Sequence, residues 1–325
     1  MCTAISFSPA AHYFGRTLDL DVSYHEEVVV TPRGYPFVFR NGESLPRHHA
    51  IIGMATVQEG YPLYYDATNE RGLSAAALNF PGNACYREAV AGRENIAPFE
   101  LIPWLLSRCA TVAEARPLLR WLNLWEVDFS PSIPLFPLHW MLADRREAVV
   151  IEQTKKGLFV HENPIGVLTN NPPFDWQMQN LHNYLNLTTK PPVNRFAEGV
   201  ELAPYSFGMG AIGLPGDLSS PSRFVRAAFT KANSRCAPTE EAAVAQFFHI
   251  MDTVAQTKGC TEMAEGHYEI TRYTSCCNTD RGIYYYTTYE NRGITAVDLH
   301  RAPLDGETLY TYPLLTAPAV TWQNR

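Results

Sequence analysis

The chain has 325 residues, of which 46% are hydrophobic and 12% aromatic, so it is long and apolar enough to bury a large core. Its formal net charge of −7 argues against nucleic acid as a partner and provides no basic patch for a membrane surface. The sequence has no basic-then-apolar N-terminal leader and no apolar run of about 18 residues, which predicts a cytoplasmic protein without a membrane helix. No Gly/Ser-rich linker, repeat or charge block divides it, so we expect one domain over residues 2–325, with Met1 removed.

Alternating apolar and polar residues, many of them β-branched, predict strands over much of the chain. In chain order the predicted strands are Thr3–Phe7, Tyr13–Leu18, Glu27–Thr31, Ala50–Thr56, Leu73–Asn79, Leu138–Ala143, Ala148–Gln153, Gly157–His161, Gly166–Thr169, Tyr268–Cys276, Gly282–Tyr289 and Gly293–Leu299. The first two are separated by a turn at residues 8–11, so we expect them to form a hairpin.

Apolar residues at helical spacing predict helices between these strands. The predicted helices are Phe99–Cys109, Val112–Leu122, Asp175–Leu187, Ser222–Asn233 and Glu240–Ala255. Thr111 and Thr239 are expected to cap the second and the last of them, whereas Pro103 and Pro117 leave the starts of the first two undecided. The order strands, helices, strands, helices, strands favours two sheets packed together with helices outside.

The seven cysteines are an odd number, widely scattered and without a C-x-x-C pair. This pattern predicts free thiols in a reducing compartment rather than a disulfide framework. The ten histidines form neither H-E-x-x-H nor a histidine pair near two cysteines, and Cys276 and Cys277 would point to opposite faces of a strand. We therefore expect no metal site, and a redox or metal protein is the least favoured functional class.

Cys2 has the most direct chemical interpretation of any residue in the chain. It is small enough for an aminopeptidase to remove Met1 ahead of it, which would leave a thiol and a free α-amino group on one residue. An α-amino group with a pKa of about 7.7–8.0 accepts a thiol's proton near neutral pH, so the pair combines a nucleophile with a base. Taken alone, Cys2 is also consistent with a small residue buried in a strand.

Two charged residues, Arg16 and Asp19, fall on or directly after the second predicted strand. The predicted hairpin brings both of them beside the mature N-terminus. There Asp19 can accept hydrogen bonds from the α-amino group, and the positive charge of Arg16 can stabilise a thiolate. An isolated R-x-x-D is more often a surface ion pair, so this motif does not decide the function by itself.

Three further residues stand at the ends of predicted elements. Asn79 and Asn170 each end an apolar strand before a proline-containing turn, where a side-chain amide is suited to donate to a developing oxyanion. Asn before a turn more often bonds its own loop. Arg223 lies in the first turn of a predicted helix, where positive charge is unfavourable, which indicates either a specific role or a partner carboxylate.

Together these segments resemble the choloylglycine hydrolase family, which contains bile salt hydrolases and penicillin V acylases. The resemblance spans essentially the whole chain and rests on motifs in a fixed order: MCTA (1–4), FGRTLD (14–19), NERGL (69–73), LNFP (78–81), LTNNPPFDW (168–176), GLPGD (213–217), SRF (222–224), YTSCC (273–277) and GIYYY (282–286). Bile salt hydrolases resemble this chain in having asparagine at position 79, where some penicillin V acylases have tyrosine.

The resemblance implies an α+β fold of the N-terminal nucleophile (Ntn) hydrolase type, an αββα sandwich of two antiparallel sheets flanked by helices, assembled as a homotetramer. It implies Cys2 as the nucleophile and its α-amino group as the general base, without a metal or an organic cofactor. The other implied catalytic residues flank this pair (Arg16 and Asp19), serve the oxyanion hole (Asn79 and Asn170) or support the site (Arg223).

The implied reaction is hydrolysis of the amide that joins a bile acid to glycine or taurine, a step in lipid metabolism. Arg16 and Arg223 are expected to supply positive charge for the anionic end of substrates of the glycocholate or taurocholate type. The steroid needs an apolar wall, and we expect it from residues that are equally consistent with ordinary packing: Leu18, Tyr65, Phe129, Leu135 and Phe136.

Two alternatives remain open at this point. Penicillin V acylase activity uses the same chemistry, and an apolar pocket discriminates poorly between apolar acyl groups. A non-catalytic carrier of bile acids is the alternative from another functional class, and it requires no reactive thiol at Cys2.

Overall fold

Two antiparallel sheets form the middle of the protein, which is described here as a computed structural model over residues 1–324. Arg325, the last residue of the predicted domain, lies outside the described residues. One sheet has six strands in the order β14 (Val167–Leu168), β1 (Cys2–Phe7), β2 (Tyr13–Leu20), β17 (Ile270–Asn278), β18 (Ile283–Thr288) and β19 (Thr295–Asp298). The other has eight strands in the order β13 (Gly157–Glu162), β12 (Ala148–Thr154), β11 (Leu138–Ala143), β8 (Ser74–Asn79), β7 (Tyr61–Asn69), β6 (Ile51–Gln58), β3 (Glu27–Thr31) and β20 (Tyr310–Pro313).

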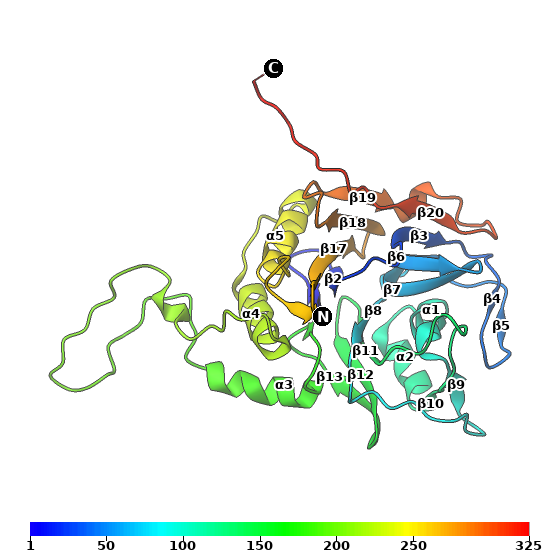
Figure 1. Ribbon diagram of the computed structural model, residues 1–325, viewed down its shortest axis with the longest axis horizontal. Coiled ribbons are helices and arrows are strands. Elements are labelled where there is room, and N and C mark those ends of the chain that lie inside the picture. Colours follow the sequence, from blue (N-terminus) through cyan, green and yellow to red (C-terminus); the bar gives the residue numbers. More distant parts are fainter. Residues whose placement is uncertain (325) are drawn as a thin grey trace.

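The helices lie outside this pair of sheets, as Figure 1 shows. On the eight-stranded side they are α1 (Leu101–Leu106) and α2 (Val112–Leu119), and on the six-stranded side α3 (Phe174–Asn180), α4 (Ser220–Asn233) and α5 (Glu240–Asp252). Three short strand pairs complete the described chain: β4 (Phe37–Val38) with β5 (Ser44–Leu45), β9 (Glu94–Ile96) with β10 (Leu122–Leu124), and β15 (Glu262–Ala264) with β16 (His267–Tyr268). The layer order is helix, sheet, sheet, helix, so the predicted α+β class and αββα sandwich are confirmed.

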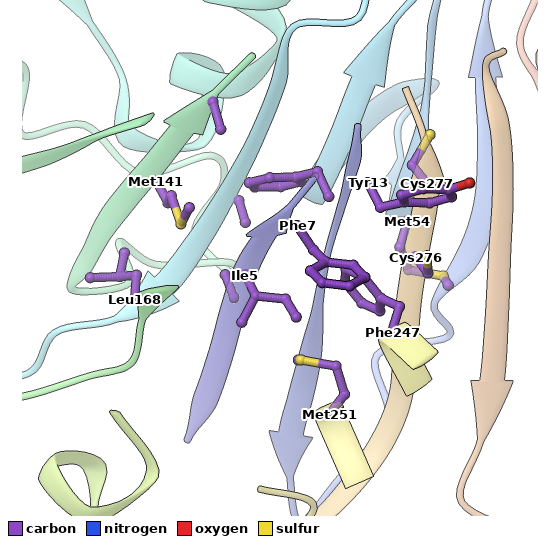
Figure 2. Packing of buried hydrophobic residues seen from close by; sticks show 14 of the residues in the cluster. Ile5, Phe7, Tyr13, Met54, Met141, Leu168, Phe247, Met251, Cys276 and Cys277 are labelled. Atoms are coloured by element: carbon purple, nitrogen blue, oxygen red, sulfur yellow. The ribbon is translucent and has the colours of Figure 1, made fainter. Parts of the chain in front are cut away.

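The core joins all of these layers. Figure 2 shows part of the larger cluster, in which Ile5 and Phe7 of β1 lie near Phe247 and Met251 of α5. Met141 of β11, in the other sheet, belongs to the same cluster. A second cluster fills the space between the eight-stranded sheet and α1 and α2. Because β1 is packed on both faces, the residue at its start is held by the core.

The predicted strands are all present, with ends that agree to within two residues. β1 and β2 form the predicted antiparallel hairpin, with Cys2 opposite Leu18. The sequence pattern does not predict β7, because Pro62 and a shortage of β-branched residues weaken its strand signal. Its pairing with β6, which includes a register shift at Met54 and Ala55, supplies the hydrogen bonds that local pattern does not reveal.

Four predicted helices are too long, among them Glu240–Ala255, which ends at Asp252 as α5. The Phe99–Cys109 helix is reduced to α1 with a short 3₁₀ turn before it, and the Val112–Leu122 helix ends before β10 begins. The Asp175–Leu187 helix continues past α3 only as a 3₁₀ turn, because the chain then leaves the body of the protein. The two predicted caps are confirmed, since Thr111 accepts from the Glu114 amide at 3.2 Å and Thr239 from the Ala242 amide at 3.3 Å.

All seven cysteines are free thiols, as the scattered pattern predicts. Among residues 1–324, no helix combines the length and apolar character needed to cross a bilayer. Within the same part of the chain, no group of three or more His, Cys, Asp or Glu side chains is placed to hold a metal ion.

Candidate active site

Cys2 begins β1, in the middle of the molecule, and is only 2% exposed. Its amide donates to Oδ1 of Asn170 at 2.9 Å, and its carbonyl accepts from Nη1 of Arg223 at 2.6 Å. Strand pairing with β2 places Leu18 opposite it. Two distant side chains therefore hold the main chain of Cys2 on both sides of the Cα atom that carries the thiol.

Met1 continues β1 by one residue along β2. Its amino group donates to the Asp19 carbonyl at 2.7 Å, and its own carbonyl accepts from the Asp19 amide at 3.0 Å. The same amino group forms an ion pair with Glu269, whose side chain is 1% exposed. Burial lowers the pKa of this amino group, and the charges of Cys2 and Asp19 oppose that shift. The next nitrogen along the chain, that of Cys2, lies in the same buried and charged surroundings.

Asp19 is completely buried, and its carboxylate is held by two hydroxyl groups. Thr271 donates to Oδ1 at 2.7 Å, and Thr17 donates to Oδ2 at 3.1 Å. Asp19 contacts the amino group of Met1 through its main-chain carbonyl, and its hydrogen bond to the α-amino group of a mature Cys2 stays a prediction. The carboxylate acts on that amino group through its charge.

Arg16 lies near Cys2 and Asp19, whose charges act on its guanidinium, and it is 1% exposed. Its Nε donates to the Thr17 carbonyl at 3.1 Å, and its Nη1 donates to the carbonyls of Tyr65, at 3.1 Å, and Ala77. Among residues 1–324, its Nη2 has no hydrogen-bond partner. A buried guanidinium with one free nitrogen is a fixed cation that can stabilise a thiolate or meet an anionic group entering the site.

Asp66 is one of several groups whose charge acts on the buried Arg16. Burial lowers the pKa of Arg16, but the charges of Cys2, Tyr273, Asp66 and Asp19 outweigh it and raise the pKa overall. Asp66 accepts from three hydroxyl groups, those of Tyr273 at 2.7 Å, Tyr284 at 2.8 Å and Ser275 at 3.0 Å. Burial raises the pKa of Asp66, and Arg16 opposes that shift.

Asn79 and Asn170 come from different sheets and meet beside Cys2. Asn79 ends β8 of the eight-stranded sheet, whereas Asn170 follows β14 of the six-stranded sheet. Nδ2 of Asn170 donates to the Asn79 carbonyl at 2.8 Å. Oδ1 of Asn170 accepts from Cys2 and, at 2.8 Å, from Nη2 of Arg223. The amide nitrogen of Asn170 is therefore oriented by its neighbours toward the gap between the sheets.

The position of Arg223 in the first turn of α4 is explained by these contacts. Besides Cys2 and Asn170, it donates to Thr3 Oγ1 at 2.7 Å and to the Leu218 carbonyl at 3.0 Å. It is fully buried, and burial lowers its pKa against the raising effect of Asp19. Arg223 thus holds the site together, whereas direct contact between Arg223 and the anionic end of a substrate finds no support in this geometry.

Of the five residues expected in the acyl pocket, two lie against the N-terminal group. Leu18 is opposite Cys2 and 3% exposed, so it belongs to the core. The Tyr65 carbonyl accepts from Arg16, and its hydroxyl lies 2.8 Å from Thr56 Oγ1.

The other three lie on the loop 129–136. The Phe129 ring is 5.3 Å from Phe99 and lines a hollow of about 340 Å³ formed with other aromatic residues. The Leu135 amide donates to Asp128 at 2.8 Å, and the exposed Phe136 meets Tyr24 edge-on at 6.3 Å. The place of this loop in the acyl pocket therefore stays a prediction.

Sequence reasoning did not find Asp66, Glu269, Thr271 or Tyr24. Asp66 lies on the unpredicted strand β7, and Glu269 directly precedes β17. A buried carboxylate can be identified by the side chains that bind it, but these side chains lie far away in the sequence. An acidic residue inside or next to an apolar strand was the one available signal.

Comparison with known proteins gives three consistent findings. The chain matches the family model described as linear amide C–N hydrolases, choloylglycine hydrolase family, over residues 2–312. It is 54% identical over 314 residues to a bile salt hydrolase/transferase of Lactiplantibacillus plantarum, with 97% of each chain covered. It is 38% identical over 318 residues to a bile salt hydrolase/transferase of Clostridium perfringens, with 96% of each chain covered.

Two solved structures are similar to this one. A mutant conjugated bile acid hydrolase from Clostridium perfringens superposes with a TM-score of 0.91 at 35% identity, covering 100% of both chains. A penicillin V acylase from Agrobacterium tumefaciens gives a TM-score of 0.75 at 20% identity, covering 95% of this chain and 90% of that chain. At 20% identity, the similarity to the penicillin V acylase shows a shared fold only.

Proposed function

Since this chain belongs to the choloylglycine hydrolase family of linear amide C–N hydrolases, we propose that it hydrolyses the amide of glycine- or taurine-conjugated bile salts. The observation that carries this proposal is the enclosure of Cys2 by Arg16, Asn170 and Arg223 in a chain 54% identical to a bile salt hydrolase/transferase. A carrier needs an apolar cavity but has no use for a buried thiol beside a guanidinium.

We propose that the reaction proceeds in two steps through a thioester. After Met1 is removed, the Cys2 thiol passes its proton to the α-amino group, and the sulfur attacks the amide carbonyl carbon. The carbon–nitrogen bond then breaks, and the ammonium returns the proton to the departing glycine or taurine nitrogen. Water next gives a proton to the same amine and attacks the thioester, which releases the bile acid and regenerates the thiol.

The oxyanion of each tetrahedral intermediate lies between Asn79 and Asn170 in this proposal. The support is geometric, because the side-chain amide of Asn170 is held beside the main chain of Cys2, and Nδ2 uses one of its two hydrogens on the Asn79 carbonyl and keeps the other for the oxyanion. A donor of this kind typically contributes about 10²- to 10³-fold to the rate. Arg16 stabilises negative charge on the sulfur, Asp19 acts on the amino group, and Arg223 positions Asn170 and Cys2.

We propose that the acyl pocket is bounded by Leu18 and Tyr65 close to the thiol and by the loop 129–136 farther out. The half-exposed pair Tyr24 and Phe136 offers apolar surface at the rim of this region. The proposed pathway is part of bile-acid and lipid metabolism in the cytoplasm.

The substrate assay separates bile salt hydrolysis from penicillin V hydrolysis. We expect kcat/KM for glycocholate or taurocholate to exceed that for penicillin V by about tenfold or more, because the steroid offers more apolar contact than a phenoxyacetyl group. Released amine is measured for all three substrates under identical conditions. Failure to cleave either bile salt would reject the proposed function, and preferential cleavage of penicillin V would replace it.

We further propose that the protein assembles as a homotetramer through the long segment between α3 and α4. Figure 1 shows this segment projecting away from the sheets. It carries a series of strongly exposed apolar side chains: Leu185, Val193, Phe196, Leu202, Tyr205 and Phe207. Apolar surface of this kind on a projecting arm is typical of contacts between subunits.

Light scattering after size-exclusion chromatography tests this assembly. We expect four copies for the wild type and a shift to smaller species for the double substitution Phe196→Ser and Phe207→Ser, because these two rings are 79% and 100% exposed on one chain. Val38→Ser, at a 62% exposed position on β4, is the control and keeps the wild-type mass. A monomeric wild-type protein would contradict the assembly without affecting the proposed chemistry.

A further inference from the structure

A buried histidine and a buried glutamate lie side by side near the active site, and the mechanism above uses neither of them. His139 of β11 and Glu152 of β12 are 0% and 1% exposed. Because Trp140 pairs with Ile151 in the antiparallel ladder, the next residues, His139 and Glu152, lie opposite each other on the two strands. Met141 and Val150, two residues away on each strand, belong to the core between the sheets, so His139 and Glu152 face that gap.

The partners of the imidazole determine its protonation state. Nδ1 of His139 lies 2.9 Å from Oε1 of Glu152, and Nε2 lies 2.9 Å from the Thr169 carbonyl oxygen. A carbonyl oxygen only accepts, and an ionised carboxylate only accepts, so both ring nitrogens must donate. The ring that satisfies both partners is therefore the doubly protonated imidazolium.

Glu152 is ionised in these surroundings. Burial raises its pKa, but the hydrogen bonds from His139 and His161 outweigh burial and lower the pKa to about 2. Its Oε2 lies 3.5 Å from Nε2 of His161, on β13, and its carboxylate also accepts from the Phe174 amide at 3.1 Å. The carboxylate is thus fixed by three elements, and it in turn fixes the imidazole.

The imidazole contacts the neighbours of both proposed oxyanion residues. Thr169, whose carbonyl accepts from Nε2, directly precedes Asn170 on the six-stranded side. Phe80, which directly follows Asn79 on the eight-stranded side, stacks on the imidazole with ring centres 4.3 Å apart and an angle of 4° between the planes. One ring therefore connects the two sheets at the point where each supplies an asparagine.

We propose that His139 is a positioning residue, which as an imidazolium held by Glu152 sets the separation of Asn79 and Asn170 and so aligns them with the developing oxyanion. It acts through the Thr169 carbonyl and the Phe80 ring and does not touch the substrate. The two asparagines come from different sheets, so hydrogen bonds within one sheet cannot fix their spacing. A displacement of about 1 Å at such a site costs roughly 10²-fold in rate.

This inference rests on the proposed function, and matched variants test it. The double substitution His139→Phe with Glu152→Gln keeps an aromatic ring against Phe80 and leaves no unpaired buried charge, but it removes the donor to Thr169. Glu152→Gln alone lets a neutral His139 keep that donor, because the glutamine amide can donate to Nδ1. Val150→Ala, at a fully buried position of the same strand, is the control for lost stability without loss of the imidazole contacts.

The expected result is a loss confined to kcat. For glycocholate at pH 7, the double variant lowers kcat by about 10- to 10²-fold and changes KM by less than about threefold, because the oxyanion forms only in the transition state. Glu152→Gln and Val150→Ala are expected to keep kcat within about threefold of the wild type. This holds for Val150→Ala even if its thermal unfolding temperature is lower than that of the double variant. A double variant with wild-type kcat, or one that loses activity only in proportion to its unfolded fraction, would overturn the proposal.

A spectroscopic measurement separates this inference from the proposed function. Nitrogen-15 NMR of the wild type at pH 7 is expected to show both ring nitrogens of His139 protonated, whereas Glu152→Gln shows one. This readout requires no substrate, so it remains decisive if the wild type fails to cleave glycocholate. A neutral His139 ring in the wild type would refute the imidazolium, and a ring without a proton on Nε2 would refute the positioning role, because Thr169 would then have no donor.

Discussion

Replacing Cys2 by alanine is expected to lower kcat/KM for glycocholate by about 10⁴- to 10⁶-fold, because the proposed reaction then has no nucleophile. The fold is expected to survive, since Asn170 and Arg223 bind the main chain of Cys2 rather than its sulfur. The rate of amine release measures the loss, and circular dichroism confirms the fold.

The chain offers a matched control for the thiol. Cys260→Ala removes another thiol, at an exposed position outside the candidate site, and is expected to leave the rate unchanged. Hydrolysis at the wild-type rate by Cys2→Ala would exclude thioester formation at Cys2. Full binding of bile acids by a wild type that releases no amine would instead favour the carrier.

Blocking the amino group of Cys2 is also expected to lower activity strongly, although by less than removing its sulfur. An N-terminal extension that ends directly before Cys2 turns the amine into an amide, which is not basic and cannot accept the thiol's proton. We expect less than about 1% of the mature activity from the extended protein, since loss of a general base costs about 10²- to 10⁴-fold. Intact mass establishes whether Met1 or the extension is present in each sample.

Cleavage of the extension restores the free amine and is expected to restore activity in the same sample. A protein with the same segment appended at the C-terminus is the control and is active before and after protease treatment. Full activity in material whose mass shows residue 1 still attached would contradict the role of the α-amino group. In that case Glu269, whose carboxylate is paired with the Met1 amino group, becomes the candidate for the base.

Most strand positions could be predicted because the strands are rich in apolar and β-branched residues, whether one face is buried or, as in β2 and β6, nearly every residue is. Helix lengths were less predictable. The Asp175–Leu187 segment keeps an apolar pattern past Asn180, but Leu185 near its end is 85% exposed, and the helix gives way to a 3₁₀ turn. The helix propensity of the residues indicates where a helix forms, whereas tertiary packing determines how far the helix continues.

The sequence by itself determined the chemistry of this protein: Cys2 beside the N-terminus and ordered motifs containing Arg16, Asn79 and Asn170 predict an amide hydrolase of one family. Only the tertiary structure brought Glu269 to the N-terminal amino group and His139 to Thr169 and Phe80, which are next to the two asparagines in the sequence. The physical reason is that a reactive group is visible as a residue type at a position. The contacts that set its charge and direction join residues more than 250 positions apart, and only the packing of two sheets brings them together.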